Sequence, residues 1–277
     1  MDSHKIHPKP LVIEARLKWL GWREFMNYRE VLRMLIFRDL KARYAQTWLG
    51  ALWIVFQPLF TVGIFALIFG RWVHLETEGI PYFLFAFSGL VSWTFVSQAI
   101  QRASQSLTLD VRLITKVYFP RLLIPLSSVM GAFLDFGILT VVLCLFVKFY
   151  GIPLTWQILA FPICLFPLFF VVLGIGSFMA ALGVYYRDIA ALMPLFLQTL
   201  MYGSPIVYST AIVPEKWLWL YQLNPMVGVL DAMRWSFLGL PHFPFHSLSV
   251  TYAISTVILS LGIVVFTNLE RKFADII

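Results

Sequence analysis

The chain has 277 residues, of which 60% are hydrophobic and 13% charged, and its formal net charge is +7. This composition leaves too little polar surface for a water-soluble globule of that length, so it excludes a soluble domain. The positive charge would suit nucleic acid, but the basic residues are confined to particular segments between apolar runs. That pattern is typical of a membrane protein and argues against a nucleic-acid partner.

The first part of the chain is polar and basic. Residues 1–26 are interpreted as a cytoplasmic N-terminal extension, and residues 27–277 as one transmembrane domain. At the start of the transmembrane domain, residues 28–44 predict an amphipathic helix, because apolar side chains recur at helical spacing opposite a basic face. Such a helix suits the cytoplasmic headgroup layer of a membrane. A soluble helix that packs on a cytosolic partner is the alternative.

Apolar runs long enough to cross a bilayer follow along the chain. About 20 residues of helix span the hydrocarbon layer. The six predicted spans are at about 49–70, 82–101, 122–147, 157–184, 189–208 and 248–268. The sequence therefore predicts an all-α, polytopic membrane protein with six transmembrane helices.

The apolar segment 209–247 is cut by several prolines and glycines, so it cannot form one straight membrane helix. Half-helices that dip into the membrane from the outer side are expected there instead. With that topology, 17 basic residues lie on one side of the membrane and 4 on the other. The excess places both termini in the cytoplasm; a full span at 209–247 would turn Arg271 and Lys272 outward.

Aromatic and polar side chains alternate along three of the predicted spans. Flat rings beside amide and hydroxyl groups suit sugars, whose C–H faces stack on the rings while their hydroxyls form hydrogen bonds. For any single residue the alternative is helix packing. The residues assigned to a substrate conduit are Trp53, Gln57, Trp93, Ser97, Gln198, Tyr202 and Tyr208.

Asp135 is the one acidic residue deep inside a predicted span, and no basic residue is expected in the membrane beside it. An ionisable group at that depth faces protein or water. It is either a proton relay of an ion-driven carrier or a hydrogen-bonded structural residue. The sequence leaves both open.

The chain contains no G-x-x-x-x-G-K-[ST] phosphate loop and no metal-ligand spacing, so it is not expected to hold a nucleotide, metal or other cofactor. Energy for transport is expected from another subunit, docked on the cytoplasmic segments 102–120 and 185–190. The residues assigned to this coupling are Thr108, Asp110, Arg112, Lys116, Arg187 and Asp188.

Short motifs occur in order along residues 30–277. They are Arg38 to Tyr44 followed by Leu49 to Pro58, then Tyr186-Arg187-Asp188-Ile189, Ser204 to Tyr208, and Leu223-Asn224-Pro225-Met226. Together they resemble the ABC-2-type permeases that export polysaccharides, and most of all the membrane subunits of O-antigen (lipopolysaccharide) exporters. Capsule and teichoic-acid permeases are near relatives within the same family.

This resemblance implies a homodimer of six-helix subunits in the bacterial inner membrane, with a channel between them for lipid-linked polysaccharide. It also implies two cytosolic ATPase subunits that bind ATP and magnesium, a coupling helix after the second span, and outer gate helices that include Asn224 and Pro225. The chain itself would then not be an enzyme. An ion-coupled secondary transporter would need internal repeats, and a membrane-embedded transferase would need an acid or histidine cluster.

Overall fold

A computed structural model describes residues 27–45, 50–77, 79–117, 119–271 and 273. All regular structure in this part of the chain is helical. The expected N-terminal extension and Lys272 lie outside the described residues. Among the described residues, five helices are long and apolar enough to cross a membrane: Gly50–Trp72, Tyr82–Leu109, Leu123–Phe149, Trp156–Tyr185 and Phe245–Glu270. They confirm the predicted all-α membrane class.

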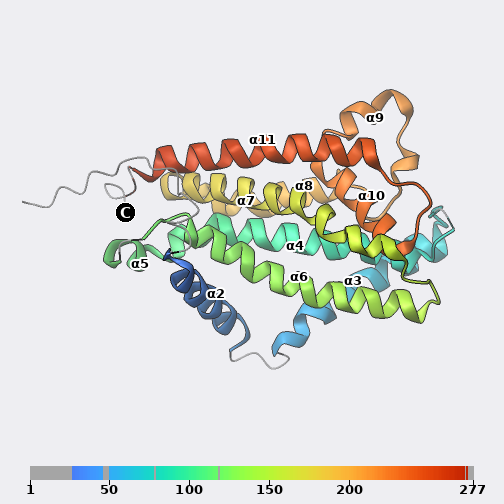
Figure 1. Ribbon diagram of the computed structural model, residues 1–277, viewed down its shortest axis with the longest axis horizontal. Helices are drawn as coiled ribbons and strands as arrows, with labels where there is room; N and C mark the ends of the chain where they lie inside the picture. Colours follow the sequence, from blue (N-terminus) through green and yellow to red (C-terminus); the bar gives the residue numbers. More distant parts are fainter. Residues whose placement is uncertain (1–26, 46–49, 78, 118, 272, 274–277) are drawn as a thin grey trace, which may run out of the picture.

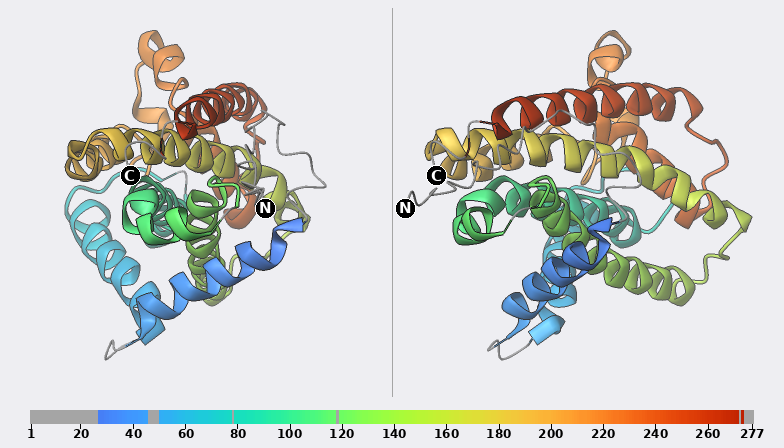
Figure 2. Two further views of the ribbon diagram at one scale, coloured as in Figure 1. Left: turned by 90° about the vertical axis from the view of Figure 1, so that its left-hand side faces the viewer. Right: turned by 60° about the vertical axis from the view of Figure 1, so that its left-hand side comes forward.

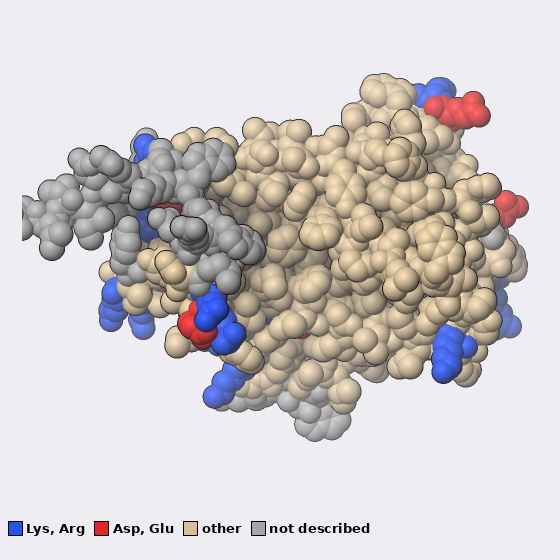
Figure 3. All heavy atoms as spheres, viewed as in Figure 1, with Lys and Arg blue, Asp and Glu red and all other residues tan. Residues whose placement is uncertain are grey.

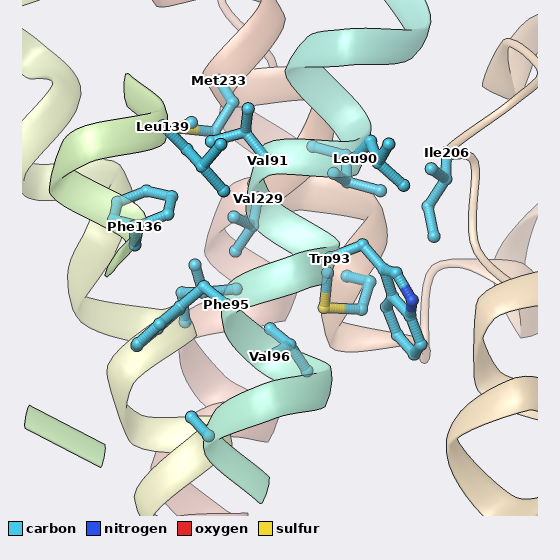
Figure 4. Close-up of a cluster of buried hydrophobic side chains, with 14 of the residues drawn as sticks. Leu90, Val91, Trp93, Phe95, Val96, Phe136, Leu139, Ile206, Val229 and Met233 are labelled. Atoms are coloured by element: carbon cyan, nitrogen blue, oxygen red, sulfur yellow. The ribbon is translucent and has the colours of Figure 1, made fainter. Parts of the chain in front are cut away.

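The long helices surround a central one, α4 (Tyr82–Leu109), as Figure 1 shows. Its neighbours are α3 (Trp53–Phe65) with its π-helical continuation η2 (Ala66–Trp72), α6 (Leu123–Phe149) and α7 (Phe161–Tyr185). The last helix, α11 (Phe245–Glu270), packs along α7. In the most apolar stretch of Tyr82–Leu109, 78% is buried inside the protein, whereas in that of Gly50–Trp72 only 17% is buried. The core therefore lies on α4, where Phe95 packs against Phe136 of α6 (Figure 4).

The fifth span is shorter than predicted. Helix α8 (Asp188–Tyr202) has 15 residues and ends at Tyr202 rather than at residue 208. Pro205 lacks the N–H that a continuing helix needs, and the chain from Ser204 to Ile206 is instead non-helical and buried. Irregular backbone at membrane depth is tolerated where protein surrounds it.

At one end of the bundle lie α2 (Arg29–Tyr44), α5 (Val111–Lys116), the start of α6 and the end of α11 (Figure 1). An apolar cluster that includes Leu35, Ile114, Phe119 and Phe266 joins them. We call this end the α5 end and the opposite one the far end. Figure 3 shows charged side chains at both ends and a face almost free of them between, as expected for a membrane protein.

Helix α2 confirms the predicted amphipathic helix at residues 28–44. Its predicted apolar face packs on the bundle, since Leu35 is buried and Tyr28, Val31 and Leu32 lie against the same cluster. Met34 and Phe37 stay exposed. Much of the apolar face that was assigned to lipid therefore contacts the protein itself.

The segment 209–247 forms two short helices at the far end, as predicted: α9 (Glu215–Tyr221) and α10 (Pro225–Leu238). Figures 1 and 2 show α9 projecting from the bundle while α10 lies within it. Residues from Met226 onward in α10 are nearly all buried, against α4, α7 and α11. The chain then enters α11 from the far end, so the segment does not cross the bundle.

Candidate functional site

Two helices carry the exposed members of the predicted conduit. On α3, Trp53 is 47% exposed and Gln57 is also exposed. On α8, Tyr202 is 66% exposed and Gln198 lies one turn before it, also exposed. Both helices pack on α4. These side chains are thus available to a substrate or to a second subunit.

Three conduit residues are brought together at the far end by hydrogen bonds. Gln198 Nε2 donates to Tyr202 Oη at 3.5 Å, and Tyr208 Oη donates to the Tyr202 carbonyl oxygen at 3.0 Å. Tyr221 of α9, which the sequence analysis missed, donates from its Oη to Tyr208 Oη at 3.0 Å. Burial raises the pKa of Tyr221, as does its bond to Tyr208. These side chains therefore present uncharged hydroxyl groups and aromatic rings, which suit a carbohydrate.

Trp93 and Ser97 of α4 lie differently from the exposed residues. Trp93 is only 6% exposed and belongs to the core, beside Leu90 and Ile206 (Figure 4). The Ser97 hydroxyl donates to the carbonyl of Thr94 in its own helix. A conduit role for these two stays a prediction, and truncation of Trp93 would also remove packing.

Part of the predicted coupling set gathers around a hollow at the α5 end. Its volume is about 460 Å³, and it is lined by Ser104, Thr108, Val111, Gly183, Val184, Arg187 and Ala190. Thr108 and Arg187, far apart in the sequence, therefore share one surface. Arg112 and Lys116 are exposed on α5, and Asp188 is exposed at the start of α8.

Asp110 has a partner within the chain. Arg38 of α2 donates from Nη2 to Asp110 Oδ2 at 2.5 Å and to Asp39 Oδ1 at 2.8 Å. The bond to Asp110 raises the pKa of Arg38 above its ordinary value, although burial opposes the rise. Asp110 thus links α2 to α5, in addition to any contact it makes with a partner subunit.

Asp135 does have charged partners, so the expectation of an isolated acid is wrong. Its Oδ2 accepts from Arg43 Nη1 at 2.8 Å and from Arg102 Nη1 at 3.0 Å, and its Oδ1 accepts from Tyr44 Oη at 2.7 Å. The reason is that α4 continues to Leu109, beyond the predicted end at residue 101, and α2 packs on α6. Both arginines were assigned to polar segments outside the spans.

This Asp135 cluster, formed by Arg43, Tyr44, Arg102 and Asp135, ties α2, α4 and α6 together. Arg102 Nη2 also donates to Gln98 Oε1 at 2.6 Å. Gly131, one turn from Asp135 on α6, leaves the room for the Arg43 guanidinium, since a methyl group there would overlap Nη2. Burial, followed by the bond to Asp135, raises the pKa of Tyr44 to about 12, so its hydroxyl stays a donor.

The predicted gate residues begin α10. Asn224 caps this helix, its Oδ1 accepting from the N–H of Met226 at 2.9 Å, and Pro225 occupies the first helical position. Asn224 Nδ2 donates to the Gly203 carbonyl and to Ser204 Oγ, both at 2.9 Å. The start of α10 is thereby fastened to the chain that follows α8.

Five long apolar helices in the described part of the chain, with the short buried helix α10 packed among them, define a polytopic membrane protein. Residues 30–238 match the ABC-2 type transporter family, and the chain belongs to that family. It is 28% identical over 251 residues to the O-antigen export system permease protein RfbA of Klebsiella pneumoniae, covering 90% of this chain and 95% of the relative. For RfbA of Myxococcus xanthus the identity is 26%, covering 91% and 97%. The identity to the polysialic acid transport protein KpsM of Escherichia coli is 23%, over 89% of this chain and 96% of that relative.

Proposed function

We propose that this permease subunit moves lipid-linked polysaccharide, with O-antigen as the substrate, across the bacterial inner membrane, driven by ATP. The observation that carries the substrate class is the uncharged, hydrogen-bonded group made by the amide of Gln198 and the rings of Tyr202, Tyr208 and Tyr221. Similarity to O-antigen permeases over nine-tenths of both chains supports the particular polymer. Capsular polysaccharide is the second candidate, favoured by the similarity to a polysialic acid transport protein.

The proposal includes two kinds of partner. Two copies of a cytosolic ATPase, which bind ATP and magnesium, dock at the α5 end against the hollow that Thr108 and Arg187 line. A second copy of this chain covers the exposed apolar faces of α3 and α8, which include Phe56, Phe60 and Leu195. A polymer then passes between the two copies.

Removal of the gene in a strain that makes O-antigen tests the function. The polymer is expected to accumulate on its lipid carrier at the inner leaflet and to disappear from the cell surface. Re-expression of this chain together with its ATPase restores surface polymer, whereas this chain with an inactive ATPase does not. Normal surface O-antigen in the deletion strain would contradict the proposal, and selective loss of capsule would favour the second candidate.

The orientation of the bundle is our first prediction. Because the basic excess lies at the α5 end, that end and both termini face the cytoplasm. In intact cells, a membrane-impermeant thiol reagent should label cysteine at Glu215 or at His242, both exposed at the far end, and should leave cysteine at Arg112 unlabelled. Lysed cells, in which all three positions react, are the control. Labelling at residue 112 from outside would reverse the orientation.

The conduit is our second prediction. A long polymer must slide, so rings offer many weak contacts rather than one tight site. Trp53→Ala and Tyr202→Ala should each slow export several-fold, while the Phe variants keep most of the rate because they keep the ring face. The readout is polymer export per molecule of inserted protein. Val257→Ala, exposed on α11 away from the proposed conduit, is the control. Normal export in both Ala variants would place the path elsewhere.

A further inference from the structure

Arg234 of α10 is buried, with only 2% of its surface exposed, in the half of the bundle nearer the far end. Its guanidinium carbon lies 3.6 Å from the ring centroid of Phe85 on α4, in cation–π contact. Its Nη2 donates to two consecutive carbonyl oxygens, Pro205 at 2.6 Å and Ile206 at 3.1 Å. A charged side chain buried this deeply needs such partners.

These carbonyls belong to the non-helical chain between α8 and α9. We call residues 203–208 the strap. Its middle part, Ser204 to Ile206, is buried, and a buried carbonyl without a donor is costly. Because α8 ends at Tyr202, no helical N–H serves the carbonyls of Pro205 and Ile206, and the Arg234 side chain donates to both. The guanidinium reaches both acceptors through the two hydrogens of Nη2 while its face lies on the Phe85 ring, a planar contact that the ammonium of a lysine does not reproduce.

The strap is also held on its other side, by α4. Tyr82 Oη donates to the Val207 carbonyl at 2.8 Å. Gly89 allows the close approach, since a Cβ at that position would lie 2.8 Å from the Ile206 oxygen and 3.2 Å from Arg234 Nη2. The strap is therefore clamped between α4 and α10, with Arg234 at the point where all three meet.

Two residues of the proposed conduit stand at the ends of the strap. Tyr202 precedes it and Tyr208 is its last residue, and both belong to the hydrogen-bonded chain of rings at the far end. A displacement of α10 relative to α8 moves the strap through the Arg234 contacts in its middle, in addition to the Asn224 bonds at its start. We propose that Arg234 is a positioning residue, which makes α10 and the substrate-facing end of α8 move as one body. Its effect on export rests on the proposed function, but the clamp itself does not.

The clamp is tested by thiol labelling of the purified full chain. The background carries Cys144→Ala and Cys164→Ala, and the probe is Tyr208→Cys. Arg234→Met removes the donors while keeping a long apolar side chain, and should raise the labelling rate at residue 208 by about tenfold or more, as expected when hydrogen bonds to a charged group are lost. Labelling of Thr256→Cys, exposed on α11, should not change.

Two further variants keep the test informative if Arg234→Met fails to fold. Gly89→Ala should raise labelling at residue 208 with Arg234 intact, whereas Gly137→Ala, where a new Cβ meets nothing within 4 Å, should not. Arg234→Lys keeps the charge and N–H donors but loses the planar contact with Phe85, and should fall between wild type and Arg234→Met. Unchanged labelling in both Gly89→Ala and Arg234→Lys would overturn the clamp.

Export separates positioning from simple structural support. Clamp variants that insert normally should export several-fold less per molecule, with Arg234→Lys recovering part of the loss. Raised labelling together with wild-type export would overturn the positioning role. A wild-type chain that exports no polysaccharide would contradict the proposed function and leave the labelling result for the clamp standing.

Discussion

Asp135→Ala is expected to lower the amount of folded, inserted protein sharply. The substitution leaves Arg43 and Arg102 without the carboxylate to which both donate, and their side chains are only 20% and 28% exposed. Removal of one partner from a buried ion pair costs about 3–5 kcal/mol, since it leaves an uncompensated charge. That is a large share of the stability of a typical protein. The measurements are protein level in the membrane and thermal unfolding in detergent.

Three variants define the cause. Asp135→Asn keeps an acceptor oxygen but loses the charge, so its stability should lie between those of wild type and Asp135→Ala. Gly131→Ala should destabilise the fold by displacing the Arg43 guanidinium without any change at Asp135. Asp188→Ala, an exposed acid at the start of α8, is the control and should be neutral. A stable, well-inserted Asp135→Ala protein would show that the cluster is dispensable for folding.

The cluster also bears on the choice between two classes of transporter. Asp135 was the only sequence feature in favour of an ion-coupled carrier. Its two oxygens accept from Arg43, Arg102 and Tyr44, so the carboxylate is fully engaged as an acceptor. A group held in this way serves structure, and membership of the ABC-2 family agrees with that interpretation.

The membrane topology was predictable because lipid imposes simple rules. Backbone groups must be satisfied within a helix, so long apolar runs become spans, and the prolines of 209–247 forced short helices instead. Asn224 and Pro225, which the family resemblance assigned to the outer gate helices, begin α10. The predicted helix lengths were wrong where apolar and polar residues alternate: α4 is longer and α8 is shorter than predicted. Residues 102–109 continue α4 because its buried face, with Ala103 and Leu107, packs on neighbours that the sequence does not reveal.

Partnerships across the fold were not predictable. Arg43 and Asp135 lie 92 residues apart, and nothing local marks them as a pair. Arg234 donates to backbone carbonyls, which carry no sequence signal, whereas its ion pair with Asp231, three residues earlier, is local. Aromatic residues pose a related problem, because Trp53 and Trp93 have similar neighbours in the sequence, yet one is half exposed and the other lies in the core.

Charge reversal at Asp110 and Arg112 together is expected to abolish export while the protein stays inserted. Arg112 is exposed on α5, and the Arg38–Asp110 pair is partly exposed, with 43% of the Arg38 side chain accessible. Exposed pairs contribute about 0.2–1 kcal/mol to stability, so the fold should survive. Reversal at Asp110 nevertheless replaces attraction between α2 and α5 by repulsion, which shifts the helix that meets the ATPase. Surface polymer per inserted molecule is the readout.

A charge swap then separates the two roles of Asp110. If its function is to hold α2 against α5, Arg38→Asp combined with Asp110→Arg restores an ion pair of opposite polarity, and export should return in large part. If Asp110 instead contacts the ATPase, the swap leaves the wrong charge on the docking surface and export stays lost. Arg112→Glu gives the comparison, because Arg38→Asp should not rescue it. We expect Arg38→Asp to restore export in the Asp110→Arg variant and not in the Arg112→Glu variant. The reason is that the Asp110 carboxylate already accepts a 2.5 Å hydrogen bond from Arg38 within the chain.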